Sequence, residues 1–256
     1  MEIGEFLREK VLRVQEYALL SAQAVANLFR RPLYMADIYT QADLIGIGSL
    51  PIVVLTGFFT GGVLALQSAS TLAQFGATGI TGNLVSLSMI KELGPVLTSL
   101  MVSGRNASGM ASELGSMQVT EQIDAMRALG TDPIKKLVTP RIVATVVMLF
   151  FLTIVSDTVG MLGGGVVGVG WLGLDASQYF HTTYQALMFP DILQGMIKPI
   201  IFGFIIATVG CYYGMTTKGG TRGVGRSTTQ AVVTASVMII VVDFLVSRFM
   251  IGIFGR

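Results

Sequence analysis

The dominant pattern along this chain is a series of long apolar runs separated by short polar intervals. No charged residue lies between Leu44 and Ile90, a stretch far longer than the roughly 20 residues that one helical crossing of a bilayer needs. A segment rich in Gly, Thr and Asn at 74–83 supplies a reversal within this run. Reading the later runs in the same way predicts five transmembrane helices, near residues 46–73, 84–117, 140–168, 192–213 and 227–253.

The first 29 residues follow a different pattern. Apolar side chains recur at spacings of three, four and seven, which places them on one helical face, opposite a charged face. The apolar set is Ile3, Leu7, Val11, Val14, Ala18, Val25 and Leu28. This predicts an amphipathic helix over 3–29 that lies in the membrane interface, with a helix packed on a soluble partner as the alternative.

Arg30-Arg31-Pro32 is predicted to end that helix, and residues 33–43 to connect it to the first span. We therefore expect two parts, an interfacial helix with its connector at 1–43 and a five-span domain at 44–256. The charged N-terminus lacks the apolar core of a signal peptide, so we expect no cleaved leader.

The longest polar interval, residues 117–140, is predicted to hold a short helix between the second and third spans. Thr120 is expected to cap its N-terminus through the side-chain oxygen. Gly130 is expected to end it in the left-handed conformation. Asp132, which precedes a proline, predicts the cap of the next helix.

The side chains of this short helix divide into two faces. Ile123, Met126 and Leu129 recur at spacing three and form an apolar edge. The remaining charged positions are Glu121, Asp124 and Arg127, of which the two acidic ones favour the positive end of the helix dipole. An apolar edge on a polar helix predicts a surface against which it is buried.

Composition agrees with a polytopic membrane protein. Of the 256 residues, 52% are hydrophobic and 12% charged, against about 25% charged in soluble domains, and mean hydropathy is +0.70. The net charge of only +2 gives no basic field for nucleic acid. The single cysteine, Cys211, and the single histidine, His181, exclude an internal disulfide, a multi-cysteine metal site and a histidine cluster.

Neither glycine-rich segment is predicted to bind a nucleotide. GGGVVGVG at the end of the third span and GGTRGVGR before the fifth lack the lysine and hydroxyl residue of a phosphate-binding loop. We interpret the first as close helix packing and the second as part of a flexible loop at 214–226. The sequence thus predicts no catalytic residue, no metal site and no cofactor of its own.

The distribution of basic residues predicts the orientation. Thirteen of the 17 Lys and Arg residues fall in the N-terminal helix, the 117–140 region with its flanks, and the loop before the fifth span. The intervals 74–83 and 170–190 contain none. By the positive-inside rule the N-terminus and the central helix are cytoplasmic, and five spans leave the C-terminus on the outer side.

Lys91 and Glu92 interrupt the second span, where ionisable groups are costly unless paired or facing a polar cavity. One interpretation is that Lys91 extends to the interface and Glu92 neutralises it. The other is that both line a cavity in which Lys91 meets an anionic headgroup. A face suited to acyl chains is formed on the first span by Leu64, Ser68, Leu72 and Phe75. Asp157 and Asp243 also lie within spans and each needs a partner or water.

Several motifs taken together resemble the MlaE/YrbE permease family, over most of the chain after residue 44. They are KELGPV at 91–96, SGRNA at 103–107, ELG at 113–115, EQIDAM at 121–126, LGTDP at 129–133, Pro140-Arg141 and GVGRSTT at 223–229. Members are membrane subunits of ABC transporters that move phospholipid or other lipids between the membranes of the bacterial envelope, or into chloroplasts in plant relatives.

The resemblance implies an all-α integral membrane protein of the bacterial inner membrane, with the interfacial helix, five spans and a cytoplasmic coupling helix between the second and third. It implies a homodimer, joined to a cytoplasmic ATPase dimer that binds the ATP and to a hexameric MCE-domain protein outside. In Gram-negative versions a small STAS-domain protein binds the ATPase. The chain itself would have no catalytic site.

The resemblance also assigns roles to residues. The family's coupling helix matches residues 120–130, which gives the apolar edge a groove on the ATPase as its partner. The coupling set is then Glu121, Ile123, Asp124, Met126, Arg127, Leu129, Gly130 and Asp132. The family's outward-opening lipid cavity favours Lys91, Leu72 and Phe75 as lining residues. Many relatives have arginine at position 91, and lysine keeps the charge but lacks the bidentate fork that suits phosphate.

Two other functions compete with this one. An ion-coupled secondary carrier would use the ionisable residues within the spans as a relay, but such carriers commonly show matched broken helices in an internal repeat, and this sequence has no such repeat. A non-transporting membrane scaffold would use the central helix only to recruit a soluble protein. ATP-dependent lipid movement would distinguish the transporter from both.

Overall fold

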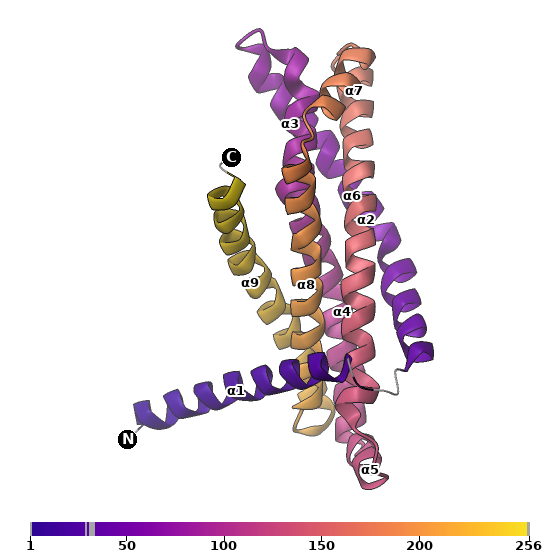
Figure 1. Ribbon diagram of the computed structural model, residues 1–256, viewed down its shortest axis with the longest axis vertical. Coiled ribbons are helices and arrows are strands. Elements are labelled where there is room, and N and C mark those ends of the chain that lie inside the picture. Colours follow the sequence, from indigo (N-terminus) through magenta and orange to yellow (C-terminus); the bar gives the residue numbers. More distant parts are fainter. Residues whose placement is uncertain (1, 29, 31–33, 255–256) are drawn as a thin grey trace. The chain divides into compact units, whose positions relative to one another are not determined.

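The structure is a computed structural model that describes residues 2–28, 30 and 34–254 (Figure 1), and the side chains of these residues except 2–7, 9, 10, 253 and 254. Within these residues the secondary structure is entirely helical. The α-helices are α1 Glu2–Leu28, α2 Met35–Ala73, α3 Thr81–Ser88, α4 Gly94–Val119, α5 Gln122–Ala128, α6 Thr139–Gly170, α7 Ala176–Gln185, α8 Phe189–Met215 and α9 Gly220–Phe254. A 3-10 turn, η1 Thr78–Ile80, and two π-helical segments, η2 Met89–Leu93 and η3 Ile134–Val138, complete the order.

Five helical stretches in the described part of the chain are long and apolar enough to cross a membrane, which confirms the predicted number of spans. They are Met35–Ala73, Thr78–Val119, Ile134–Gly170, Phe189–Met215 and Gly220–Gly252. Most extend beyond their predicted ranges. The physical reason is that backbone hydrogen bonds continue a helix into polar sequence, where no apolar side chain is required.

Two segments predicted to be irregular are helical instead. The predicted connector at 33–43 forms the first turns of α2 from Met35 onward, and the predicted loop at 214–226 is helical from Gly220 onward. Gly219 and Gly220 have φ of +91° and +66°, which glycine adopts without the strain of a Cβ. The reversal before α9 is therefore short. Arg31 and Pro32, predicted to break α1, lie outside the described residues.

The chain folds into two compact units, which are described one at a time. Unit 1 comprises Met1–Asp43, Ser103–Thr145 and Phe204–Val237. Unit 2 comprises Leu44–Val102, Val146–Gly203 and Met238–Arg256. The long helices α2, α4, α6, α8 and α9 contribute residues to both units.

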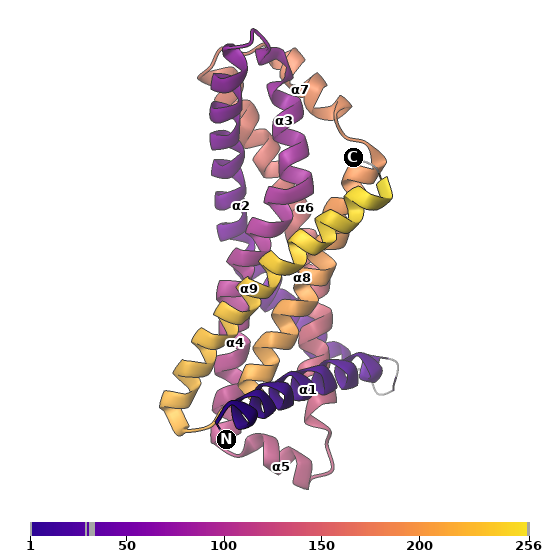
Figure 2. The ribbon, with the colours of Figure 1, turned by 90° about the vertical axis from the view of Figure 1, so that its left-hand side faces the viewer.

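In unit 1, α1 runs across the last turns of α8 (Figures 1 and 2). The hydroxyl groups of Tyr17 and Thr208 are hydrogen-bonded at 2.8 Å. The rings of Tyr17 and Tyr212 meet edge to face, with their centroids 5.8 Å apart. Leu20 and Ala24 are buried in the same unit. These contacts hold α1 across the part of α8 that belongs to unit 1.

The predicted apolar face of α1 remains largely uncovered. Val11 and Val14 are 64% and 67% exposed, and Ala18 and Val25 are exposed as well. The side chains of Ile3 and Leu7 lie outside the described ones. An uncovered apolar face next to a membrane domain suits the headgroup and acyl boundary, and its placement there stays a prediction.

In unit 2, glycines bring α2 and α6 into close contact. A Cβ on Gly57 would lie 2.8 Å from the carbonyl oxygen of Ser156, and a Cβ on Gly61 would overlap the carbonyl of Gly160. A Cβ on Gly163 would likewise meet the backbone of Phe58. Small residues permit this approach between membrane helices, which confirms the interpretation of the glycine-rich end of the third span as helix packing.

The predicted loop between the third and fourth spans contains a further helix, α7, which packs on α3 (Figure 2). The Asp175 carboxylate caps α7 by accepting from the Gln178 N–H at 2.7 Å. Tyr179 is only 2% exposed, and its hydroxyl donates to the Met161 carbonyl at 3.3 Å. Burial raises the pKa of Tyr179 to about 12, although a hydrogen bond with Thr183 lowers it, so the phenol keeps its proton at neutral pH.

Candidate functional site

Lys91 and Glu92 lie in η2, the π-helical segment that interrupts the second span between α3 and α4. The Gly94 N–H donates to the Met89 carbonyl, five residues back, as a π-helical turn requires. Pro95 follows and has no N–H to offer the Lys91 carbonyl that an α-helix would pair with it. Single π turns of this kind are frequent at functional sites, and here one presents two charged residues.

Lys91 forms an ion pair with Asp191, at the start of α8. Its Nζ lies 3.0 Å from Asp191 Oδ1, and the side chains are 23% and 9% exposed. The Asp191 carboxylate also accepts from the Met188 N–H at 3.2 Å. The interpretation in which Glu92 neutralises Lys91 is therefore wrong. Neighbours in a helical backbone project in different directions, so each finds a partner on another helix.

Glu92 instead belongs to a network centred on Lys198 of α8. Lys198 Nζ is fully buried, forms ion pairs with Glu92 and Asp243, and donates to the Lys91 carbonyl at 2.8 Å. Ser247 donates to the other oxygen of Glu92 at 2.9 Å. The predicted need of Asp243 for a partner is met by Lys198, 2.8 Å away. The network thus joins η2, α8 and α9 within unit 2.

Sequence reasoning missed Asp191 and Lys198. A signal was present, because Lys198 is a lone cation inside the fourth apolar run, and an ionisable residue there is by default paired or functional. The Lys198 ammonium group donates to the Lys91 carbonyl, to which Pro95 has no N–H to donate. That relation depends on two helices more than 100 residues apart, and spacing along one helix does not reveal it.

The predicted acyl-chain face of α2 is only partly open. Leu64, Ser68 and Leu72 are half-buried, and Leu64 packs against the buried cluster of Ala65, Val85 and Met89. Phe75 lies two residues beyond the end of α2 and is 78% exposed. These four residues line neither of the two pockets found in unit 2. Their role in lipid binding stays a prediction.

The central helix α5 begins differently from the prediction. Thr120 does not cap it, because its hydroxyl donates to the Ser116 carbonyl at 2.8 Å and completes the end of α4. Glu121 is the capping residue, in the left-handed conformation with φ 59° and no side-chain cap bond. That conformation costs a residue with a Cβ about 1–2 kcal/mol. A single strained residue therefore turns the chain from α4 into α5.

The apolar edge of α5 is not available as a whole to a partner. Ile123 is fully buried within the chain, Met126 is half-buried, and only Leu129, at 84%, is freely exposed. The expectation that all three fill a groove on an ATPase is therefore wrong for Ile123. Asp124 and Arg127 form an exposed ion pair at 2.8 Å on the outer side of the helix.

The end of α5 matches the prediction. Gly130 has φ +75° and its N–H donates to the Arg127 carbonyl at 3.0 Å, while the Thr131 N–H donates to the Met126 carbonyl at 3.0 Å. This pair of bonds is the Schellman arrangement at a helix C-terminus. Asp132 then caps the next segment by accepting from the Ile134 N–H at 2.9 Å.

The segment around α5 is tied to its surroundings in unit 1 by polar contacts. Asp132 accepts from the Asn27 side chain of α1 at 3.3 Å. Arg141, only 5% exposed, pairs with Glu113 of α4 at 2.8 Å, which gives Glu113 the partner that its place near the end of the second span requires. Lys136 pairs with Asp37 of α2. These contacts join the chain that follows α5 to α1, α2 and α4.

Comparison with known proteins shows to which family the chain belongs. A family model described as Permease MlaE matches residues 38–249. A probable ABC transporter permease protein of Rickettsia typhi is 41% identical over 234 residues, or 91% of this chain and 90% of the relative. The intermembrane phospholipid transport system permease protein MlaE of Haemophilus influenzae is 34% identical over 213 residues, or 83% and 82% of the two chains.

A plant protein is related as well. The chloroplastic protein TRIGALACTOSYLDIACYLGLYCEROL 1 of Arabidopsis thaliana is 37% identical over 231 residues, which cover 90% of this chain and 66% of the relative. The family match extends over both units and all five apolar helices, and the resemblance seen in the motifs is confirmed. The chain belongs to the MlaE permease family, whose members are membrane components of ABC transporters.

Proposed function

We propose that this chain is the membrane subunit that moves phospholipid, or a related lipid, between the inner and outer membranes, energised by a separate ATPase. The observation that carries the proposal is the 34% identity to an intermembrane phospholipid transport permease over 83% of the chain. The five apolar helices supply the membrane domain. The secondary-carrier alternative is less favoured, because the sequence has no internal repeat with matched broken helices.

On the substrate side, the proposal assigns headgroup binding to Lys91 and chain contact to the half-open face of α2 near Leu72 and Phe75. Lys91 keeps 23% of its side chain exposed while paired to Asp191. A lipid phosphate would therefore compete with the Asp191 carboxylate for one ammonium group. When the lipid leaves, the Asp191 carboxylate pairs with Lys91 again, so the ammonium group always has an anionic partner. Such an exchange suits reversible binding.

On the ATPase side, the proposal assigns the contact to the outer surface of α5, namely Leu129 with the Asp124 and Arg127 pair. Ile123 acts inward, as the buried anchor that couples α5 to the rest of unit 1. Exposed Leu and charged groups on one surface form an apolar centre with a polar rim, as in protein interfaces generally. Movement of the ATPase would then pull on α4 and on the segment that leads to α6.

The proposed assembly follows the family resemblance. The chain forms a homodimer in the bacterial inner membrane, with a cytoplasmic N-terminus, a periplasmic C-terminus and α1 in the inner interface. A cytoplasmic ATPase dimer contacts α5, with a STAS-domain protein on the ATPase where one is present, and a hexameric MCE-domain protein lies outside. The basic residues near α5 and at the start of α9 support this orientation.

The proposal is tested by reconstituting the complex in vesicles and following fluorescent phospholipid from donor to acceptor membranes. We expect movement that requires both this chain and ATP hydrolysis by the partner. Movement that proceeds unchanged without the ATPase would eliminate the ABC-type mechanism. An assembly that forms but moves no lipid with ATP would favour the scaffold alternative.

Lys91→Ala should lower the phospholipid recovered with the purified complex several-fold, because it removes the cation proposed to meet the phosphate. Asp191→Asn should retain or raise that recovery, since it frees Lys91 from its carboxylate. Recovery is measured by quantitative mass spectrometry of extracted lipid. If both variants lose lipid equally, the ion pair supports the fold and does not contact a headgroup.

Exchanging the charges of the exposed pair, Asp124→Lys with Arg127→Glu, should weaken ATPase association while membrane insertion stays intact. The exchanged residues can still pair with each other, so α5 itself is preserved, and only a partner sees the reversal. Co-purification of the ATPase measures the effect. Gln74→Glu, a charge change in the hairpin predicted to lie on the outer side, is the control. An unchanged ATPase yield with the exchanged pair would show that this surface is not part of the interface.

A further inference from the structure

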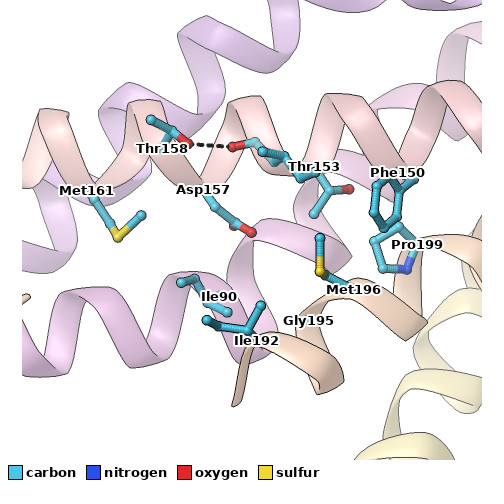
Figure 3. Close-up of a pocket in the computed structure, with 11 residues that line it drawn as sticks. Ile90, Phe150, Thr153, Asp157, Thr158, Met161, Ile192, Gly195, Met196 and Pro199 are labelled. Carbon is cyan, nitrogen blue, oxygen red and sulfur yellow. Dashed lines mark hydrogen bonds between the residues drawn. The ribbon is translucent and has the colours of Figure 1, made fainter. Parts of the chain in front are cut away.

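A pocket lies in unit 2 between α6, α8 and η2, apart from the residues assigned above (Figure 3). Its empty volume is about 590 Å³, including the part open to the surroundings. The lining is apolar apart from Thr153, Thr158 and Asp157. Both threonine hydroxyls already donate to carbonyls of their own helix. Among the residues that line the pocket, Asp157 alone supplies a polar side chain that is not hydrogen-bonded to its own helix.

Asp157 is only 9% exposed, and its Oδ1 atom has no hydrogen-bond partner among the described residues. Figure 3 shows its carboxyl group pointing from α6 toward Ile90 and Met196. Gly94 makes space for Oδ1, since a Cβ there would overlap that oxygen, so the carboxyl group meets the pocket through Oδ2. An unpaired carboxylate is costly among apolar side chains at membrane depth. A neutral carboxyl group can instead donate one hydrogen bond to an acceptor.

The pocket lies near one end of the fourth span. Its α8 residues, from Ile192 to Pro199, belong to the first three turns of that helix. The Lys91 and Asp191 ion pair is adjacent, since both residues directly precede or follow pocket residues in sequence. Phe189, at the start of α8, is 77% exposed, as aromatic residues at membrane interfaces often are. The ion pair thus supplies charged groups at the same end of α8 as the pocket.

We propose that this pocket binds one acyl chain of a glycerophospholipid from the surrounding bilayer, with Asp157 donating a hydrogen bond to the ester carbonyl of that chain. The apolar side chains of the lining would pack against the methylene groups of the acyl chain. The Asp157 carboxyl group would donate to the ester carbonyl, the hydrogen-bond acceptor of that chain. The site shares no lining residue with the α2 face or with Lys91, so it does not depend on the proposed transport.

The extent of the pocket distinguishes a lipid chain from a partner's transmembrane helix. Along α6 it reaches only from Phe150 to Met161, which is about 17 Å at 1.5 Å per residue. A membrane-spanning helix would contact α6 along the full apolar thickness, about 30 Å. A short pocket whose lining has one polar side chain free to bond a ligand suits the ester end of a flexible chain.

The test uses the full-length protein in nanodiscs that contain a phosphatidylethanolamine with a diazirine in its acyl chain. After photolysis, labelled peptides from α6 and α8 are quantified by mass spectrometry. Labelling of residues 150–161 and 192–199 in the wild-type protein should be saturable and should fall several-fold with excess unlabelled dioleoylphosphatidylethanolamine. This measurement needs no variant. Labelling that rises linearly with probe and resists competition would overturn the proposal.

Variants then locate the chain and its ester. Thr158→Phe fills the pocket and should lower labelling at least five-fold, whereas Val166→Phe, at an exposed position of α6 outside the pocket, should leave it unchanged. Asp157→Leu should lower labelling, and Asp157→Asn, which still donates, should keep most of it. Equal labelling in Thr158→Phe and Val166→Phe would refute the site.

The hydrogen bond to the ester is tested separately by comparing the two Asp157 variants. Equal labelling in Asp157→Leu and Asp157→Asn would refute that bond. Labelling that disappears only when the outer partner is added, with a crosslink to that partner in its place, would assign the pocket to a protein helix and overturn the lipid proposal. Transport is measured separately on the same variants. Loss of labelling with unchanged lipid transfer would therefore leave the proposed function standing.

Discussion

Replacing Lys198 with methionine should destabilise the protein by about 3–5 kcal/mol, the usual cost of removing one partner from a buried ion pair. Lys198 is fully buried and holds two carboxylates, Glu92 and Asp243, together with the Lys91 carbonyl. Methionine has a similar length but no charge and no donor. Unfolding of the purified protein by sodium dodecyl sulfate in mixed micelles, followed by circular dichroism, measures the change.

Two further variants separate the charge effect from the loss of a long side chain. Lys218→Met makes the same substitution at an exposed lysine and should change stability by less than about 0.5 kcal/mol. Adding Glu92→Gln and Asp243→Asn to Lys198→Met removes the carboxylates that Lys198→Met leaves unpaired. This triple variant should recover much of the lost free energy of unfolding, because a neutralised buried network is often tolerated. No recovery in the triple variant would show that charge pairing is not what Lys198 contributes.

Gly61→Ala should cost about 3 kcal/mol and loosen the contact between α2 and α6. The added methyl group would overlap the Gly160 carbonyl, and the obstacle is backbone, which cannot rotate away as a side chain can. Overpacking of this kind costs typically about 1–3 kcal/mol and sometimes more. The same unfolding measurement applies, and a cysteine pair placed across α2 and α6 would report the separation.

Gly109→Ala is the matched control. Gly109 lies within α4 on an exposed face, and a Cβ there would have no neighbour within 4 Å. Since alanine is favoured over glycine inside a helix by about 0.5–1 kcal/mol, this variant should be neutral or slightly stabilising. If both substitutions had the same effect, close contact between α2 and α6 would not be what Gly61 permits.

Periodicity and local chemistry predicted the elements well where the cause is local. The five spans follow from runs of apolar residues, and the end of α5 follows from Gly130, because a left-handed residue favours glycine wherever the helix lies. The start of α5 was missed for the opposite reason. The Thr120 hydroxyl could accept from an N–H of the following helix or donate to a carbonyl of the preceding one. Because α4 continues up to Val119, the hydroxyl donates to the Ser116 carbonyl.

Pairing between helices could not be predicted from spacing. Lys91 and Glu92 looked like mutual partners because they are adjacent in sequence, yet each is bonded to a residue about 100 positions away. For the apolar edge of α5 as well, spacing along the helix does not tell which residue is buried. Ile123 and Leu129 are equivalent in the helical pattern, but one faces the chain's own interior and is buried, while the other is 84% exposed.

The sequence by itself determined that this is a five-span helical membrane protein with a short polar helix between the second and third spans, and its motifs placed it in a family. Apolar length and turn chemistry act within one segment, so one segment suffices to infer them. Only the tertiary structure decided which charges are paired, which side of α5 is free, and that Asp157 faces a pocket. Those properties depend on which helices meet, and helix contacts join residues far apart in the chain.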